Sequence, residues 1–231
     1  NMVKLMSVAH KNKLYVVEDA CHAIGASSQE GNMGAIGTTG CFSLHPLKNL
    51  NVWGDGGIIC TNSGSLANQL RLLRNHGLAD RETCEVFGYN SRLDTIQAVV
   101  ASHMLGKLEN INSKRLHNAN YLDRALRAIP QVKMVNQNRN YISHSYHLYS
   151  QLFEERDKLK EYLNSIGVDA KIHYPVPMHL QPAARYLGYK KGDFPITESV
   201  TASILSLPIH EFISRQQLDI MITGILRFYN L

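Results

Sequence analysis

The sequence lacks the features that mark membrane proteins and nucleic-acid-binding modules. No apolar run approaches the roughly 18 residues that a membrane-spanning helix needs. The 24 basic and 19 acidic residues give a formal net charge of +5, and the basic residues form no block with interleaved aromatic residues. A mild positive charge is equally compatible with anionic ligands, including phosphorylated ones. We therefore expect a globular protein with neither a membrane nor a nucleic acid as its partner.

Paired cysteines are also missing. The four cysteines are Cys21, Cys41, Cys60 and Cys84, and no two of them have Cys-x-x-Cys spacing. Three of them lie among apolar or small residues. We expect buried, free thiols in the reducing environment of the cytoplasm.

The first twenty residues have no basic start, apolar stretch or cleavage site, so they do not form a signal peptide. Apolar residues between Val3 and Ala9 predict a helix with no capping residue before it. A Lys-Asn-Lys turn and an apolar run follow, which predicts a buried parallel strand over Leu14–Val17. A helix already under way at the first residue suggests a chain that starts within a domain.

The rest of the chain divides into two patterns. Strands are predicted over 37–43 and 56–61, a helix from an N-cap at Ser63 to Gly77, and one kinked or two separate helices over 93–129. After Pro130 the pattern predicts strands over 145–153 and 168–174, a helix over 155–167 and a final helix that contains Leu218 and Phe228. This favours an α/β half followed by a small α+β domain. We divide the chain into residues 1–105, a connecting helix over 106–130, and residues 131–231.

Two polar segments are candidates for chemistry. Glu18 and Asp19 follow the first apolar strand, and the carboxyl ends of strands are where open α/β sheets bind ligands. They are equally compatible with capping of a following helix. Lys48 lies between a strand and Gly-Asp-Gly-Gly, and Pro46 disfavours helix at the preceding residue, which predicts a loop. This segment alone is also compatible with a solvated loop lysine.

Five stretches together identify a known family. They are VVEDACHAIGA, GTTGCFSLHPLKNLNVWGDGGIICTN, LRNHG, GYNSRLDTIQA and YPVPMHLQP, and they follow the family's order across nearly the whole chain. The sequence resembles the DegT/DnrJ/EryC1/StrS family of sugar aminotransferases that depend on pyridoxal 5′-phosphate (PLP). The resemblance implies fold type I of the PLP-dependent transferases, similar to aspartate aminotransferase. It implies part of the large domain and a small α+β C-terminal domain.

The resemblance also implies roles for residues of the large domain. Lys48 matches the lysine that forms the internal aldimine with PLP and later moves a proton. Asp19 matches the aspartate that pairs with the pyridinium nitrogen of the cofactor. Ser43 matches a serine that binds the PLP phosphate. Asn90 matches an asparagine that reaches the phosphate from the neighbouring subunit, which implies a homodimer with shared active sites.

Other matches are less direct. His22 stands where many relatives carry glutamine near the ring oxygen of the cofactor. Arg92 is expected to orient the Asn90 loop or to meet the substrate's phosphate. His173, Tyr174 and His179 fall in the region that borders the sugar in the family, and we predict that they bind substrate.

The presence of Lys48 favours amino transfer, because relatives with histidine at that position are dehydratases. The expected reaction moves an amino group, usually from glutamate, to a keto group of a nucleotide-linked deoxysugar, with a weak preference for 3-keto sugars. Relatives also carry a longer N-terminal segment that helps to bind PLP. We therefore expect this chain to be an N-terminally truncated member that folds poorly and binds PLP weakly on its own.

Alternative interpretations remain. One is a non-catalytic or regulatory relative, or an inactive fragment. Another is a metal site, although no recognisable ligand spacing supports it. Its ligands would be Asp19, Cys21, His22 and His45.

Overall fold

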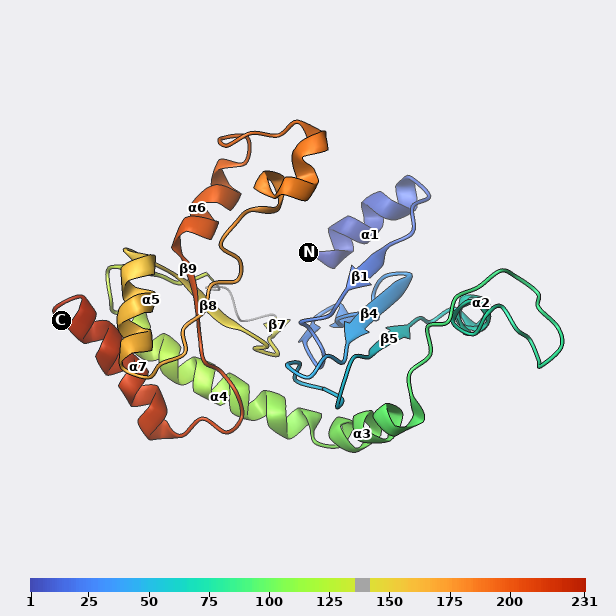
Figure 1. Cartoon of the computed structure of the whole chain (residues 1–231), viewed down its shortest axis with the longest axis horizontal. Helices are drawn as coiled ribbons and strands as arrows, with labels where there is room; N and C mark the ends of the chain where they lie inside the picture. The colour runs from blue at the N-terminus through green and yellow to red at the C-terminus, as the bar shows by residue number, and fades with distance from the viewer. Residues whose placement is uncertain (136–141) are drawn as a thin grey trace. The chain divides into compact units, whose positions relative to one another are not determined.

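The computed structural model describes residues 1–135 and 142–231. The chain forms two compact units. The first comprises residues 1–113 and 142–147, and the second comprises residues 114–135 and 148–231. Figure 1 labels the helices and strands of both. The division into a large-domain part, a connecting helix and a small domain stays a prediction.

A three-stranded sheet forms the centre of the first unit. Its strands, in spatial order, are β1 (Val17–Asp19), β4 (Thr39–Ser43) and β5 (Gly57–Cys60), which lie side by side in Figure 1. β1 runs parallel to β4, whereas β5 is antiparallel to β4. The strands predicted over 37–43 and 56–61 are thus confirmed. The carboxyl ends of β1 and β4 lie at one edge of the sheet, where α/β proteins bind ligands.

The predicted position of the first strand is wrong. The chain enters the ladder only at Val17, and the side chains of Leu14 and Tyr15 are 61% and 87% exposed. Before the ladder, the Val16 N–H donates to Thr38 Oγ1 at 3.0 Å and the Thr38 N–H donates to Val16 O at 2.8 Å. Because β1 is an edge strand of the described sheet, its apolar residues are not covered on all sides as a central parallel strand would be.

Helices α1 (Met2–Lys11) and α2 (Gly64–Arg74) of this unit both have side-chain caps. Asn1 Oδ1 accepts from the Lys4 N–H at 2.9 Å, so the expectation that α1 lacks a cap is wrong. Ser63 Oγ accepts from the Leu66 N–H at 3.3 Å, which confirms the predicted start of α2. α2 ends three residues before Gly77.

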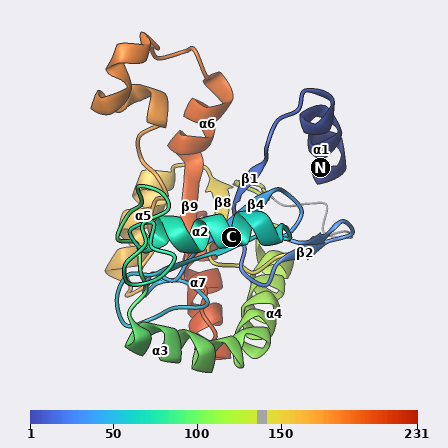
Figure 2. The ribbon, with the colours of Figure 1, turned by 90° about the vertical axis from the view of Figure 1, so that its right-hand side faces the viewer.

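The helical region over 93–129 consists of two helices, α3 (Thr95–Leu105) and α4 (Leu108–Leu126), separated at Gly106 (Figure 1, Figure 2). The apolar spacing of the sequence predicts one face with Leu93, Ile96, Val100 and Met104, and Leu93 and Met104 do pack against the core. Ile96 is 58% exposed, so its part of that prediction is wrong, and Ala101 is buried in the core cluster. The core cluster of this unit consists of buried Leu44, Leu50, Val52 and Ala101, with Ile24, Leu93, Met104 and Leu108 packed against them.

A second small sheet joins distant parts of the first unit. Its strands are β2 (Ser27–Ser28), β3 (Gly31–Asn32) and β7 (Ile142–Ser143), and β2 pairs with both neighbours in antiparallel fashion. The sequence pattern does not reveal these two-residue strands. They bring the backbone around residue 143 beside the segment that follows β1.

The second unit contains an antiparallel sheet, three complete α-helices and the larger part of α4 among its described residues. The strands are β6 (Val132–Lys133), β8 (Tyr149–Phe153) and β9 (Ile204–Leu207), with β8 in the middle. The helices are α5 (Arg156–Ser165), α6 (Pro195–Ser203) and α7 (Arg215–Phe228). Two short 3₁₀ helices, Met178–Leu180 and Pro182–Leu187, interrupt the proline-containing loop. Alternating burial along β8 confirms the predicted half-exposed strand, which starts at Tyr149.

The strand predicted over 168–174 is wrong. Only Lys171 pairs there, through an isolated bridge to Ser206. The Lys171 and Ser206 backbones exchange two hydrogen bonds, at 3.0 and 2.8 Å. Pairing is confined to that one residue, so the apolar alternation of the segment does not produce a regular strand.

The two units have different architectures, an α/β unit with a mixed sheet and an α+β unit with an antiparallel sheet, as the sequence predicts. Of the helices in the described residues, none combines the length and apolar character that a membrane crossing requires.

Candidate active site at the β1 and β4 edge

Asp19 is the last residue of β1, at the carboxyl edge of the sheet. It pairs in register with Cys41 of β4, so Ser43, two residues further along β4, lies at the same edge. The Cys21 N–H donates to Asp19 Oδ1 at 3.1 Å, and the Cys21 Sγ lies 3.8 Å from Cys41 O. This local turn holds an exposed carboxylate at the end of a parallel strand.

The pKa of Asp19 lies below its ordinary value. The main causes are hydrogen bonds to the carboxylate from the Cys21 thiol and then from the Cys21 N–H, and the positive charges of His22 and Lys48 lower the pKa further. Asp19 is therefore ionised near neutral pH. The charges of His22 and Lys48 act on this carboxylate, and Lys48 follows β4, whose carboxyl end lies beside that of β1.

Lys48 belongs to a turn, as predicted. The Lys48 N–H donates to His45 O at 2.9 Å, and Pro46 occupies the second position of this turn, where its fixed φ is favourable. The Asn51 side chain donates to Lys48 O at 2.9 Å. The Val52 N–H donates to Leu44 O at 2.9 Å, which closes the base of the loop.

Buried residues on both sides hold the Lys48 loop in place. Leu44 and Leu50 are 0% and 2% exposed, and Asn49 is 3% exposed, whereas Leu47 is 75% exposed. Lys48 itself is half-buried. Its buried neighbours in the sequence thus fix the backbone on both sides of the lysine.

His22 is exposed and lies beside a second histidine. The ring centroids of His22 and His147 are 4.3 Å apart, with the planes tilted by 54°. The Ser145 hydroxyl donates to His22 O at 2.8 Å. The backbone at residue 22 is therefore held by a segment more than a hundred residues further along the chain.

Asn90 and Arg92 are brought together with each other. The Arg92 guanidinium donates to Asn90 Oδ1 at 3.1 Å and to Asn75 Oδ1 at 3.4 Å, and Asn75 and Asn90 form an isolated bridge. In the part of the chain that the structure describes, no hydrogen bond or ion pair connects them to Asp19 or Lys48. They form an exposed pair beside the C-terminal end of α2.

The other predicted residues belong to the second unit. His173 Nδ1 lies 2.9 Å from Ser206 Oγ, and Tyr174 is 67% exposed. His179 Nε2 lies 3.0 Å from Glu198 Oε1, and the side chain of His179 is only 8% exposed. Its ring is thus committed to a contact within the second unit.

Comparisons with known proteins identify the family. The model of the DegT/DnrJ/EryC1/StrS aminotransferase family matches residues 1–226. The chain belongs to this family. Family membership confirms the resemblance seen in the sequence and, with the structural likeness below, the fold type.

Named members of the family are similar to this chain over most of its length. The Erythromycin biosynthesis sensory transduction protein EryC1 of Saccharopolyspora erythraea is 37% identical over 215 residues, which cover 93% of this chain and 58% of that protein. The dTDP-3-amino-3,4,6-trideoxy-alpha-D-glucose transaminase of Streptomyces venezuelae is 36% identical over 94% of this chain and 57% of its own length. The chain therefore spans less than two thirds of the length of these relatives.

A solved family structure has the same fold. The crystal structure of DesV from S. venezuelae in complex with a ketimine intermediate superimposes with a TM-score of 0.95 and 34% identity. The superposition covers 100% of this chain and 62% of the DesV chain. The fold type expected from the sequence is thus confirmed over the whole chain.

Sequence reasoning missed several polar residues around the family's lysine segment. Asn49 is buried next to Lys48, and its amide contacts Asn112 and Ser145, which are far away in the sequence. The available signal was an amide side chain directly after Lys48, in a stretch with few charged residues. Only the tertiary structure shows its partners.

Glu18 has a clear structural role. Its carboxylate accepts three backbone N–H groups, from Gly34 at 2.8 Å, Ile36 at 2.8 Å and Gly37 at 2.6 Å. Of the two adjacent acidic residues at the end of β1, Glu18 thus binds the protein's own loop and Asp19 stays at the open edge.

The cysteines are free, but the expectation that they are buried is wrong. Cys60 and Cys84 are exposed, and Cys21 and Cys41 are half-buried. β5, which contains Cys60, is exposed along its length. Among the described residues, no group of three or more histidine, cysteine or acidic side chains is placed to hold a metal ion.

Proposed function

We propose that this chain acts in PLP-dependent transfer of an amino group to a keto group of a nucleotide-linked sugar. The observation that carries the proposal is the arrangement at the carboxyl ends of the parallel strands β1 and β4, where Asp19 and Ser43 end their strands and the turn that contains Lys48 follows β4. The family of the chain and the transaminase among its relatives support the same reaction.

The chemistry of the residues at this edge fits PLP. The cofactor has a basic ring nitrogen, an aldehyde and a phosphate. The site offers an ionised carboxylate at Asp19, a hydroxyl at Ser43 and an amine at Lys48. When bound, PLP supplies an electron sink for carbanion chemistry and carries the amino group.

Each residue then has a defined task. Asp19, kept ionised by Cys21, holds a proton on the ring nitrogen. Lys48 would hold the aldehyde through its amine and would move protons at the reacting carbon. Ser43 would donate to the phosphate. His22, whose backbone is held by Ser145, would take the position beside the ring oxygen.

The remaining predicted residues complete the proposal. Asn90 reaches the phosphate in a second copy of the chain, so that a homodimer shares its active sites, and Arg92 orients Asn90. His173 and Tyr174 bind the sugar. His179 also contributes to sugar binding, from the segment that its contact with Glu198 stabilises. The amino donor is glutamate, which leaves as 2-oxoglutarate.

The test is to trap the lysine on its cofactor. The chain is incubated with PLP and treated with borohydride. Hydride reduces the bond between the lysine and the aldehyde to a stable secondary amine, and peptide mass mapping locates it. We expect an adduct on Lys48 that is absent in Lys48→Ala and retained in Lys107→Ala, which removes an exposed lysine of the same unit. Labelling spread over many lysines, unchanged in Lys48→Ala, would contradict the assignment.

A regulatory function is the second candidate, because one similar relative is named a sensory transduction protein. Such a protein could bind PLP without turning over. Release of 2-oxoglutarate from glutamate in the presence of PLP discriminates between the two. Release that depends on Lys48 supports the aminotransferase, and a trapped Lys48 without any release supports the regulatory relative.

A further inference from the structure

We propose that a buried polar network of Asn49, Asn112 and Ser145 positions Lys48 relative to Asp19. We call these three residues the Asn49 network. The inference rests on the proposed function for the importance of that placement. The network itself is defined by contacts within the first unit.

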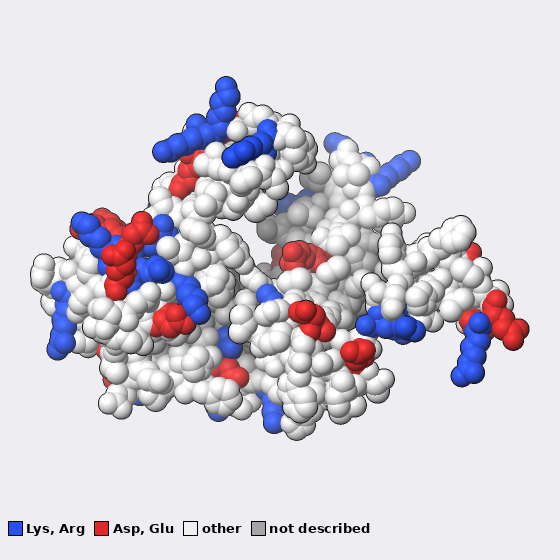
Figure 3. All heavy atoms as spheres, in the orientation of Figure 1, with Lys and Arg blue, Asp and Glu red and all other residues white. Residues whose placement is uncertain are grey.

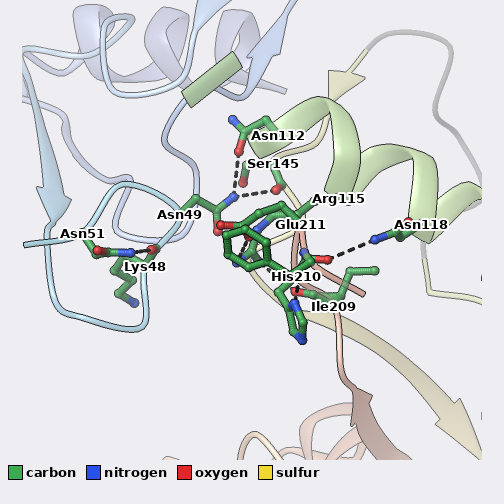
Figure 4. Close-up of polar contacts among 11 residues, drawn as sticks. Lys48, Asn49, Asn51, Asn112, Arg115, Asn118, Ser145, Ile209, His210 and Glu211 are labelled. Carbon is green, nitrogen blue, oxygen red and sulfur yellow. Dashed lines mark hydrogen bonds and ion pairs between the residues drawn. The ribbon is translucent and has the colours of Figure 1, made fainter. Parts of the chain in front are cut away.

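Asn49 is the centre of the network. It directly follows Lys48 and is 3% exposed. Its Nδ2 donates to Asn112 Oδ1 at 2.8 Å and to Ser145 O at 2.7 Å (Figure 4). Figure 4 also shows the Asn51 amide donating to Lys48 O. Since the Lys48 N–H donates to His45 O, both backbone polar groups of the lysine are hydrogen-bonded.

The two partners of Asn49 continue to the segment that follows Asp19. The Asn112 Nδ2 donates to Ile24 O at 3.0 Å. The Ser145 hydroxyl donates to His22 O at 2.8 Å. Two separate routes therefore connect the residue after Lys48 to the backbone three and five residues after Asp19.

The polarity of these contacts requires asparagine at position 49. Both acceptors that face Nδ2 are oxygens, one from an amide side chain and one from the backbone. A carboxylate at this position would place oxygen against oxygen in a buried site. Asn49→Asp is therefore a nearly isosteric substitution that removes both hydrogen bonds and adds repulsion.

Gly25 leaves the space that the Asn112 side chain needs. Gly25 has φ +73°, and a Cβ built there collides with Asn112 Nδ2. The close approach lets the Asn112 amide reach the Ile24 carbonyl. The loop after β1 thus packs directly against the network.

Apolar packing makes the connection stiff. Leu50 and Val52, which follow Asn49, are 2% and 1% exposed and belong to the core cluster. Ile24 packs against the same cluster. Both segments of the site therefore share one core, and the polar network fixes the register between them.

The first test needs no cofactor. Hydrogen exchange is measured by mass spectrometry on the full chain, with two groups of hydrogen-bonded amides as reporters. Lys48 and Val52 report on the lysine loop, and Ala23 and Ala26 report on the segment after Asp19. We expect Asn49→Ala to lower the protection of both groups about fivefold or more, as the loss of a net hydrogen bond implies.

Asn118→Ala is the matched control. Like Asn49, Asn118 is a buried asparagine whose amide donates to a backbone carbonyl, in this case His210 O at 3.0 Å. It lies in α4. It belongs to the second unit. We expect it to lower overall stability in a similar way, without a specific loss of protection at the amides of the two reporter groups.

The second test measures the placement of the lysine amine. The rate of Lys48 trapping by PLP and borohydride is compared with the Tm of each variant. We expect Asn49→Asp and Asn112→Ala to slow trapping about tenfold, because misplacement by about 1 Å can cost up to about 10²-fold. Asn118→Ala should trap at the wild-type rate despite its lower Tm.

The outcomes separate this inference from the proposed function. Loosening of the lysine loop alone in Asn49→Ala, with trapping no slower than in Asn118→Ala, overturns the positioning role. Loss of protection in both reporter groups supports it. If Asn49→Ala lowers the protection of both groups but wild-type Lys48 is never trapped, the network stands as a structural connection and the proposed function fails.

Discussion

The Cys21 backbone N–H donates to Asp19 Oδ1 at 3.1 Å, which places the Cys21 thiol near the same carboxylate. The interaction shifts the pKa values of the two side chains in opposite directions. It lowers the pKa of Asp19 and, together with burial, raises the pKa of the Cys21 thiol. One residue thus stabilises the negative charge that the proposed chemistry requires at the sheet edge.

Thiol reactivity tests this pair of residues. The interaction with Asp19 raises the pKa of Cys21, which lowers the fraction of reactive thiolate near neutral pH. We therefore expect maleimide to label Cys21 more slowly than the exposed Cys60 at a pH of about 7.5. Asp19→Asn removes the carboxylate and should speed labelling of Cys21 but not of Cys60. Peptide mass spectrometry resolves the sites. Equal rates at the two cysteines in the wild type would contradict the prediction.

Acid stability tests the Asp19 charge separately. Because the pKa of Asp19 is lowered on folding, ionised Asp19 stabilises the native state above its ordinary pKa of 3.8. This contribution is lost as the pH falls from about 3.8 through the lower native pKa. We expect the midpoint of urea unfolding to fall less steeply with decreasing pH in Asp19→Asn than in the wild type. Asp80→Asn is unsuitable as a control, since the pKa of Asp80 is also lowered. Asp55→Asn, which changes an exposed carboxylate of the same unit, serves as the control. An acid limb equally steep in Asp19→Asn would show that this carboxylate does not contribute.

Glu18 offers a test of the loop beside the site. Glu18→Ala leaves three backbone N–H groups of the 34–37 loop without their acceptor, and we expect a loss of about 2–4 kcal/mol of unfolding free energy. Glu18→Gln keeps one acceptor oxygen and should lose less. Urea unfolding measures both. Glu30→Ala, which removes an exposed carboxylate bonded to Ser28, serves as the control and should change stability little.

The titration of His173 can be followed by NMR. Burial, and then the charge of Lys171, lower the pKa of His173 below the ordinary 6.5. The protonated form is thus favoured in the unfolded chain, so stability falls as the pH drops from about 6.5 towards the native pKa. We expect Lys171→Met to raise the pKa of His173 and His173→Gln to remove this pH dependence. A His173 titration unchanged in Lys171→Met would exclude the charge of Lys171 as a cause.

The local parts of the site could be predicted from the sequence. Pro46 and the glycines after Lys48 indicate a loop, and the structure confirms a turn from His45 to Lys48. Ser63 likewise marks the start of α2 correctly. These features depend on backbone preferences within a few residues, which the sequence shows directly.

The parts that depend on distant contacts could not be predicted. The apolar run from Leu14 indicates a buried strand, but pairing with β4 starts only at Val17. Asn49 contacts residues 63 and 96 positions away, and no local pattern reveals such partners. The roles assigned to Lys48, Asp19 and the other site residues through the family resemblance stay predictions until the trapping experiment is done.

The Asn49 network ends on the main chain after Asp19, at the carbonyl oxygens of His22 and Ile24. A carbonyl is present whatever side chain a residue carries. The side chain at position 22 can therefore be exchanged without loss of these contacts. An engineer can vary this position to tune the site while its scaffold stays intact.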